Sequence, residues 1–156
     1  MKQSRQKRDG GYMEQEKKAK RFFQSIRNSY KELECLKEQR NKLFSMLTST
    51  SIKLKEVDVM TSGSGDKMSE VVPVMIELDE KINTQITSII EKQLKAEKVI
   101  QQIDNMKYRE TLRWYYVQNL RWEEVAKRMN YDISYVQRVN GQALISAAEF
   151  MTEEIE

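Results

Sequence analysis

Side chains that commonly act as catalysts or metal ligands are scarce in this sequence. Histidine is absent, which removes the most frequent general base and the most frequent metal ligand. The single cysteine, Cys35, cannot form an intramolecular disulfide, and beside Leu36 it is best interpreted as a small packing residue. The carboxylates alternate with Lys and Arg along predicted helix surfaces. The sequence therefore predicts no enzyme, no cofactor and no zinc site of the ordinary type.

The segment Gly63 to Lys67 reads Gly-Ser-Gly-Asp-Lys and could suggest a phosphate-binding loop. It lacks the spacing G-x-x-x-x-G-K-[ST], and no strand is predicted before it. A flexible connector is the better interpretation of these residues.

Residues 122–141, WEEVAKRMNYDISYVQRVNG, have the spacing of a helix-turn-helix motif. Val125 and Ala126 supply an apolar and a small residue to the first short helix, and the small residue lets the two helices touch. Asn130 falls at the turn, because asparagine tolerates a left-handed backbone better than most residues other than glycine. Asp132 suits the N-cap of the second helix. In such motifs the second helix lies in a DNA major groove, although any tight helical hairpin would match part of the pattern.

Apolar residues extend this pattern on both sides of the motif. Val136 and Val139, three residues apart, turn the apolar face of the second helix inward. An upstream helix, which such a motif needs to close a core, is predicted by the stripe Leu112, Tyr116 and Leu120. The second helix continues downstream through Ala143, Leu144, Ala147 and Ala148.

The composition is typical of long helices exposed to solvent. Hydrophobic residues make up 39% of the 156 residues and charged residues 33%, with one proline and five glycines. No stretch approaches the length of about 18 apolar residues that a membrane span needs, and the basic N-terminus lacks the apolar segment of a secretory signal. We therefore expect an all-α protein without a membrane partner, located in the cytoplasm.

Four parts are predicted along the chain. Residues 1–12 are polar and basic, which favours a disordered arm that either contacts phosphates or only solubilises the protein. Residues 13–104 are predicted to form a long antiparallel helical hairpin, a coiled coil with its loop at 55–68. Residues 105–150 would form the helix-turn-helix domain, and residues 151–156 an acidic tail.

Apolar residues at steps of three and four predict one seam on each hairpin helix. The first seam consists of Phe22, Ile26, Leu33, Leu36, Leu43 and Leu47, interrupted by Arg40 and widened by Tyr30 and Phe44. The second consists of Val72, Met75, Asp79, Ile82, Ile86, Ile89, Gln93, Ala96, Ile100 and Ile103. Pro73 would lie in the first turn of this second helix. An antiparallel pairing in which residue numbers sum to about 122 would place Gln93 beside Ser29 as a polar layer.

Three apolar residues of the second hairpin helix, Ile90, Leu94 and Val99, lie outside the strict seam. They either flank a wide seam or form a second face that binds another copy. We favour self-association as a dimer through the hairpin, because a two-helix hairpin buries little. The alternative is a monomer in which the hairpin packs on its own helix-turn-helix domain.

The stretch from Tyr108 to Leu144 resembles the helix-turn-helix with which bacterial sigma factors read the −35 promoter element. The matching residues are Arg109, Glu110, Leu112, Arg113, Tyr116, Trp122 to Ala126, Val136, Arg138, Gly141, Ala143 and Leu144. The layout as a whole resembles small phage and prophage transcription regulators of the RinA/ArpU kind. Asn119 and Asn130 stand where that family often has glycine. Arg121 replaces the usual capping Ser or Thr and leaves only Glu124 of a capping box.

The resemblance implies activation of phage late genes in a bacterial host, through binding of upstream double-stranded DNA and contact with RNA polymerase. It also implies DNA-binding residues. Those of the recognition helix are Ser134, Tyr135, Gln137, Arg138 and Gly141, among which Arg138 could pair with guanine and Gln137 with adenine. Asp132 and Ile133 lie at the helix N-terminus, where backbone N–H groups can take a phosphate. Phosphate contacts that position the protein are implied for Arg121, Lys127 and Arg128.

Two alternatives to transcription regulation stay open. A DNA-packaging protein such as a small terminase subunit also joins a helix-turn-helix to an oligomerising helical region. An adaptor could instead grip RNA polymerase or a host protein without binding DNA. The adaptor is supported by the recognition helix, where Arg138 is the only cation, and by the acidic end from Glu149 to Glu156.

Overall fold

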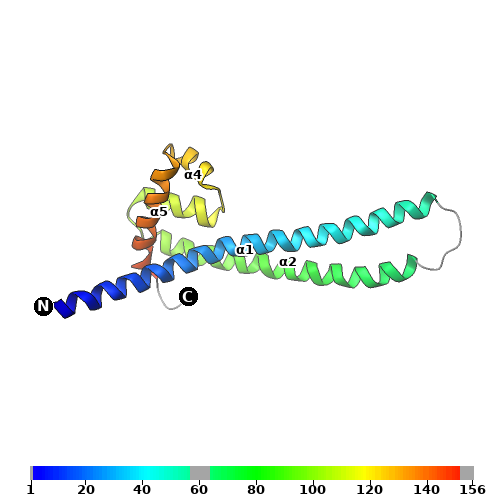
Figure 1. Ribbon diagram of the computed structural model, residues 1–156, viewed down its shortest axis with the longest axis horizontal. Helices are drawn as coiled ribbons and strands as arrows, with labels where there is room; N and C mark the ends of the chain where they lie inside the picture. Colours follow the sequence, from blue (N-terminus) through cyan, green and yellow to red (C-terminus); the bar gives the residue numbers. More distant parts are fainter. Residues whose placement is uncertain (1, 57–63, 152–156) are drawn as a thin grey trace. The chain divides into compact units, whose positions relative to one another are not determined.

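The structure is a computed structural model, and the part of the chain that it describes is built from helices without strands (Figure 1). It describes residues 2–56 and 64–151, with side chains at 14–49 and 68–151. The elements are α1 (Lys2–Glu56), α2 (Ser64–Ile100), α3 (Met106–Leu112), the π-helical segment η1 (Arg113–Val117), α4 (Trp122–Met129) and α5 (Ile133–Ala148). The predicted all-α class, with an antiparallel helical hairpin before the C-terminal helices, is confirmed. None of the described helices is long and apolar enough to cross a membrane.

The first helix is longer than the sequence suggested. Because α1 begins at Lys2, the arm predicted as disordered over residues 1–12 is helical in the structure from residue 2 onward. Glycine in a helix costs only about 1 kcal/mol relative to alanine, so a long helix without proline can include Gly10 and Gly11. The loop predicted at 55–68 is shortened from both sides, and residues 57–63 lie outside the described residues, as do residues 152–156 of the predicted acidic tail.

Pro73 lies inside α2, not in its first turn as predicted, because α2 begins at Ser64. Proline lacks the backbone N–H that would bond to the carbonyl four residues earlier. Pro73 and Ser69 are both exposed, so water can satisfy the carbonyl that this proline leaves without its helical partner.

The chain divides into two compact units. We call residues 1–30 and 89–156 the motif unit, and residues 31–88 the hairpin unit. This division differs from the predicted domain boundary at 104/105, because one end of each long helix packs with the C-terminal helices.

In the hairpin unit, α1 and α2 run antiparallel and meet along a narrow seam. Leu33 and Leu78 are its buried apolar residues, and Arg40 Nε lies 2.5 Å from Asp79 Oδ1. Leu78 was not part of the predicted seam, whereas Val72, which was, is 41% exposed. The ion pair explains why the buried position of α2 is Leu78 and not the predicted Asp79. The charged Asp79 stays half-exposed at the edge of the seam, and the neighbouring Leu78 fills its centre.

The main core of the motif unit draws on α1, α2, α3, η1 and α5, whereas α4 packs in a second cluster. Phe23 is fully buried, while the predicted seam residue Phe22 packs beside it with ring centroids 5.3 Å apart. Val99 is fully buried, so it does not contribute to a second exposed face. The remaining members of the core are Ile26, Ala96, Ile100, Ile103, Leu112, Tyr116, Val117, Ala143, Leu144 and Ala147.

The predicted antiparallel register, in which the numbers of paired residues sum to about 122, is confirmed in the motif unit. Lys92 Nζ donates to Ser29 Oγ at 2.6 Å, and Gln93 Nε2 donates to Tyr30 Oη at 2.6 Å. The polar layer therefore exists, with Gln93 bonded to Tyr30 and Lys92 bonded to Ser29. Gln93 and Tyr30 both also donate to the backbone oxygen of Val117, which ties the hairpin to the end of η1.

Candidate nucleic-acid interface

A sharp turn joins α4 and α5, as the motif spacing predicted. Asn130 adopts the left-handed backbone, with φ 58° and ψ 46°, and the N–H of Tyr131 donates to the Ala126 oxygen at 3.0 Å. Ala126 is 4% exposed, and its neighbour Val125 packs with Val136 across the two helices. The predicted roles of Ala126 and Asn130 are thereby confirmed.

The starts of α4 and α5 each lack the hydrogen bond that an N-cap side chain would accept. At α4, Glu124 Oε2 accepts a hydrogen bond from the N–H of Arg121 at 3.0 Å. The guanidinium of Arg121 carries only donors, so it cannot return the bond, and half of the capping box is missing. At α5, Asp132 has the extended backbone of an N-cap, but its side chain forms no capping hydrogen bond. The Asp132 carboxylate is exposed.

The outer face of α5 presents polar side chains at helical spacing. Ser134, Gln137 and Arg138 are exposed, as predicted for residues that face a groove. Gln142, which lies one turn beyond Arg138, is exposed as well and was missed, although its i+4 spacing from Arg138 could have indicated it. Ile133, at the helix N-terminus, is 40% exposed.

Gly141 is half-buried on α5, and nothing described lies within 4 Å of the position that an added Cβ would take. Packing within the protein therefore gives no reason for glycine at this position.

An open hollow lies where α4 passes into α5. Its lining consists of Ala126, Lys127, Asn130, Tyr131, Asp132, Ser134, Tyr135 and Arg138. The structure therefore gathers Lys127, Asp132, Ser134, Tyr135 and Arg138, five of the predicted site residues, around one hollow. The other five, Arg121, Arg128, Ile133, Gln137 and Gly141, do not line it.

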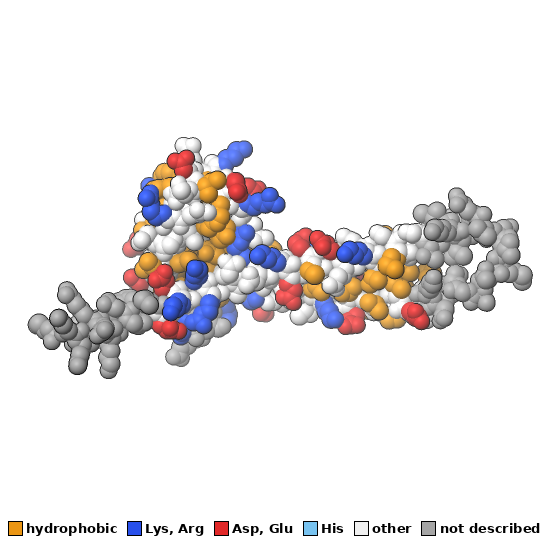
Figure 2. Space-filling view, viewed as in Figure 1, with side chains coloured by type: hydrophobic (Ala, Val, Ile, Leu, Met, Phe, Trp, Pro, Cys, Tyr) orange, Lys and Arg blue, Asp and Glu red, His pale blue; other side chains and the backbone are white. Residues whose placement is uncertain are grey.

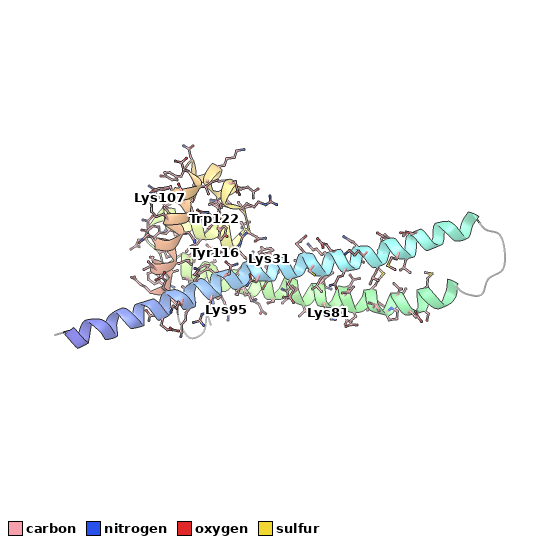
Figure 3. All side chains as sticks on the ribbon, viewed as in Figure 1. Lys31, Lys81, Lys95, Lys107, Tyr116 and Trp122 are labelled. Carbon is pink, nitrogen blue, oxygen red and sulfur yellow. The ribbon has the colours of Figure 1, made fainter. Side chains whose placement is uncertain are left out.

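Two tyrosines hold cations beside this hollow. The rings of Tyr131 and Tyr135 lie 4.6 Å apart, and the guanidinium of Arg138 lies 5.4 Å from the Tyr135 centroid. Lys107 is labelled in Figure 3. Its Nζ lies 5.0 Å from the Tyr131 centroid and 3.4 Å from the Tyr135 hydroxyl oxygen. The phenol group of Tyr131, followed in size of effect by that of Tyr135, raises the pKa of the Lys107 ammonium above its ordinary value, because both groups interact favourably with its charged form.

Sequence reasoning missed Lys107 and assigned Tyr131 no role in the site. Lys107 belongs to α3, 28 residues before Tyr135, so no local spacing could have linked them. Only the packing of α3 against α5 brings the lysine to the tyrosines.

The cations of α4 flank the same turn. Lys127 and Arg128 are exposed in the last turn of the helix, and the Arg128 guanidinium lies 4.6 Å from the Trp114 ring. Arg121 is exposed at the start of the helix. Figure 2 shows Lys and Arg side chains at several places on the motif unit, with Asp and Glu side chains between them.

The helix-turn-helix is held in place by α1. Arg27 Nη1 donates to the backbone oxygens of Tyr115 and, at 2.9 Å, of Leu120, and the Arg27 guanidinium lies 3.9 Å from the Tyr115 ring centroid. The Tyr115 ring stacks on Trp122, with centroids 3.6 Å apart and planes at 12°. A continuous series of contacts thus runs from α1 to the first residue of α4. In addition, Arg113 of η1 forms an ion pair with Glu97 of α2.

Cys, Asp and Glu side chains do not cluster as metal ligands in the part of the chain that the structure describes. No group of three or more Cys, Asp or Glu side chains is placed there to hold a metal ion.

Comparison with known proteins assigns the chain to a family. No curated protein and no solved structure matches the chain. The family described as "Protein of unknown function (DUF1492)" matches residues 46–146, about two-thirds of the sequence. That range begins near the end of α1 and runs through the turn between α4 and α5 almost to the end of α5. The chain belongs to this family of DUF1492 proteins.

Proposed function

We propose that this protein is a sequence-specific regulator of transcription that reads double-stranded DNA with α5. The observation that carries the proposal is the outer face of α5, where Ser134, Gln137 and Arg138 are exposed at helical spacing after the left-handed turn at Asn130. A helix in this arrangement fits the major groove, where each base pair presents a distinct pattern of donors and acceptors.

Within this proposal the exposed side chains have separate roles. Arg138 pairs with guanine through two parallel hydrogen bonds, and Gln137 pairs with adenine. The contact of Arg138 with Tyr135 limits the directions in which its guanidinium can point. Lys127, Arg128 and Arg121 contact phosphates and set the position of the protein on the duplex.

We further propose that two copies associate through the hairpin. In the motif unit, Ile90 is 49% exposed and Leu94, one turn later on α2, is 62% exposed. Association removes this apolar surface from water. A symmetric pair of motifs also reads two half-sites about 34 Å apart, or a multiple of that spacing.

The regulated genes follow from the resemblance to phage regulators alone. On that basis we propose activation of phage late genes through contact with bacterial RNA polymerase, in the bacterial cytoplasm. The adaptor alternative, which contacts the polymerase or a host protein without DNA, is favoured by one observation: Arg138 is the only cation of α5.

Selection of bound fragments from the genome of origin, at near-physiological salt, tests the proposal. We expect the protein to enrich one short site and Arg138→Ala to lose that preference, because a bidentate pair contributes about 1–3 kcal/mol of base discrimination. Both proteins should unfold at the same temperature, since Arg138 is exposed.

Arg21→Ala is the matched control for this selection. It removes the same charge from α1, where Arg21 is exposed and pairs with Glu14, and it should leave the enriched site unchanged. If the unmodified protein is folded and enriches no site, the DNA-binding proposal is wrong and the adaptor alternative is favoured. Capture of RNA polymerase by the immobilised protein would then be the next measurement.

A further inference from the structure

We propose that Lys107 of α3 is a phosphate contact, so that the DNA-binding surface extends from α5 to the start of α3. This inference rests on the proposed function, because it assigns a further residue to the same DNA-binding surface. It concerns a position to which neither the helix-turn-helix spacing nor the resemblance assigns a role.

The first step is that Lys107 is held in place. Its ammonium group lies 3.4 Å from the Tyr135 hydroxyl oxygen and within 5.0 Å of the Tyr131 ring centroid. A lysine side chain on a solvent-exposed surface ordinarily samples many rotamers, and ordering it on binding costs free energy. Here the side chains of Tyr131 and Tyr135 already restrict it beside α5.

The second step is that this cation lacks a negative partner within the described residues. Neither Lys107 nor Arg138 forms an ion pair with any described carboxylate. Both approach the ring of Tyr135, at 5.8 and 5.4 Å from its centroid. An aromatic ring attracts a cation only weakly at exposed sites and does not neutralise its charge. An anion placed beside the two cations would remove their mutual repulsion.

The third step concerns the kind of anion. Three cations that form no ion pair with a described carboxylate are distributed over three helices: Lys107 on α3, Lys127 on α4 and Arg138 on α5. The hollow beside them is open towards solvent, and Asp132 contributes one carboxylate to its lining. Spread cations around an open surface fit the repeated phosphates of a nucleic-acid backbone, whereas a free phosphate ion would need donors that converge on one point. The partner chemistry is therefore the phosphodiester backbone of double-stranded DNA.

The test compares Lys107→Gln with Lys98→Gln. Lys98 is exposed on the last turn of α2 in the same unit, so the two variants lose the same charge. Binding is measured by fluorescence anisotropy on two duplexes of equal length, one with the selected site and one with random sequence, at several salt concentrations. We expect Lys107→Gln to weaken binding to both duplexes equally, by about fivefold near 0.15 M salt. The slope of log Kd against log salt should fall by about one.

Lys98→Gln should match the unmodified protein, and Lys107→Arg, which keeps the charge, should restore most of the slope. Equal slopes for Lys107→Gln and Lys98→Gln would overturn the inference while leaving the proposed function standing. If Lys107→Gln weakened binding only to the duplex with the selected site, the inference would also be overturned, because Lys107 would then be a base contact. If the unmodified protein shows no salt-dependent binding to either duplex, the proposed function fails and this inference fails with it.

Discussion

At the scale of single residues, Tyr116 places a hydroxyl group in the core of the motif unit. The side chain is 3% exposed, its ring packs against Phe23, and its hydroxyl accepts a hydrogen bond from Asn140 Nδ2 at 3.3 Å. Burial raises the pKa of Tyr116, because the phenolate would lose its hydration, while the Asn140 hydrogen bond opposes this shift. Asn140 Oδ1 has no hydrogen-bond partner among the described atoms. Tyr116 is therefore a buried hydroxyl with one bond across the core.

This environment predicts how stability depends on alkaline pH. The ordinary pKa of tyrosine is 10.0, and the folded value is higher. Above the unfolded pKa the unfolded chain releases the proton while the folded protein keeps it, so the free energy of unfolding falls as pH rises towards the folded pKa. We expect Tyr116→Phe to reduce this fall, and to cost about 1 kcal/mol at pH 7 through the lost hydrogen bond. Denaturant midpoints at pH 7 and at several pH values above 9 measure both effects.

If the free energy of unfolding of Tyr116→Phe fell at alkaline pH as much as that of the unmodified protein, this assignment would be contradicted. Tyr30 would then be the next candidate, because burial also raises its pKa.

At the scale of elements, α1 does more than pair with α2. Arg27 donates hydrogen bonds to two backbone oxygens, that of Tyr115 just before the end of η1 and that of Leu120 just after it. These carbonyls lie where the chain leaves the helical segment and enters the left-handed turn at Asn119, with φ 55°. Carbonyls at such a point have no helical partner, and Arg27 of α1 donates hydrogen bonds to both of them.

Replacing this arginine tests the connection. We expect Arg27→Ala to lower the free energy of unfolding by about 2–3 kcal/mol, because it removes charge-assisted hydrogen bonds from a half-buried site. Urea titrations followed by circular dichroism measure the loss. Arg21→Ala, which removes an exposed pair with Glu14 and an exposed hydrogen bond to the Lys17 backbone oxygen, should cost less than about 1 kcal/mol. Equal losses in the two variants would show that Arg27 does not hold the elements together.

The hairpin unit illustrates why the details of a helix seam depend on the partner helix. The sequence indicated Arg40 as an interruption of one seam and included Asp79 in the other. In the structure the two side chains pair through Arg40 Nε and Nη2, and Leu78 occupies the buried position. Periodicity located the face of α2 to within one residue but did not show which residue packs, because that depends on the side chains of α1.

At the scale of the whole molecule, the exposed apolar residues of α2 lead to a test of self-association. We expect the protein to sediment as a dimer and the double variant Ile90→Glu, Leu94→Glu to sediment as a monomer, because burying two carboxylates at an interface is unfavourable. The double variant Gln101→Glu, Gln102→Glu is the control, since it adds the same charge at exposed positions of the same unit. Sedimentation equilibrium at micromolar concentrations distinguishes these states.

Helical content should be equal in all three proteins. A monomer in the unmodified protein would mean that the hairpin serves only to support the helix-turn-helix, as the contacts of Arg27, Tyr30 and Gln93 within the motif unit already allow.

What the sequence alone determined is local in origin. The spacing of apolar residues predicted the hairpin helices and both helices of the motif, and Asn130 predicted the left-handed turn, because helical period and backbone preference act over a few neighbouring residues. The candidate residues on the outer face of α5 follow from the same period. The structure differs from the prediction at residues 2–12, which belong to α1, because a local count of glycine and charge does not include the helix that continues from the other side.

Tertiary structure decided what depends on contacts between distant residues. It buried Phe23 in preference to Phe22 and brought Lys107 to Tyr135, which lies 28 residues further along the chain. It also joined Arg27 to the carbonyls beside α4. Such pairs are set by the way helix faces pack in three dimensions, where a rotation of one residue exchanges a buried side chain for an exposed one. The period of a single helix contains no information about the side chains on the helix that it meets.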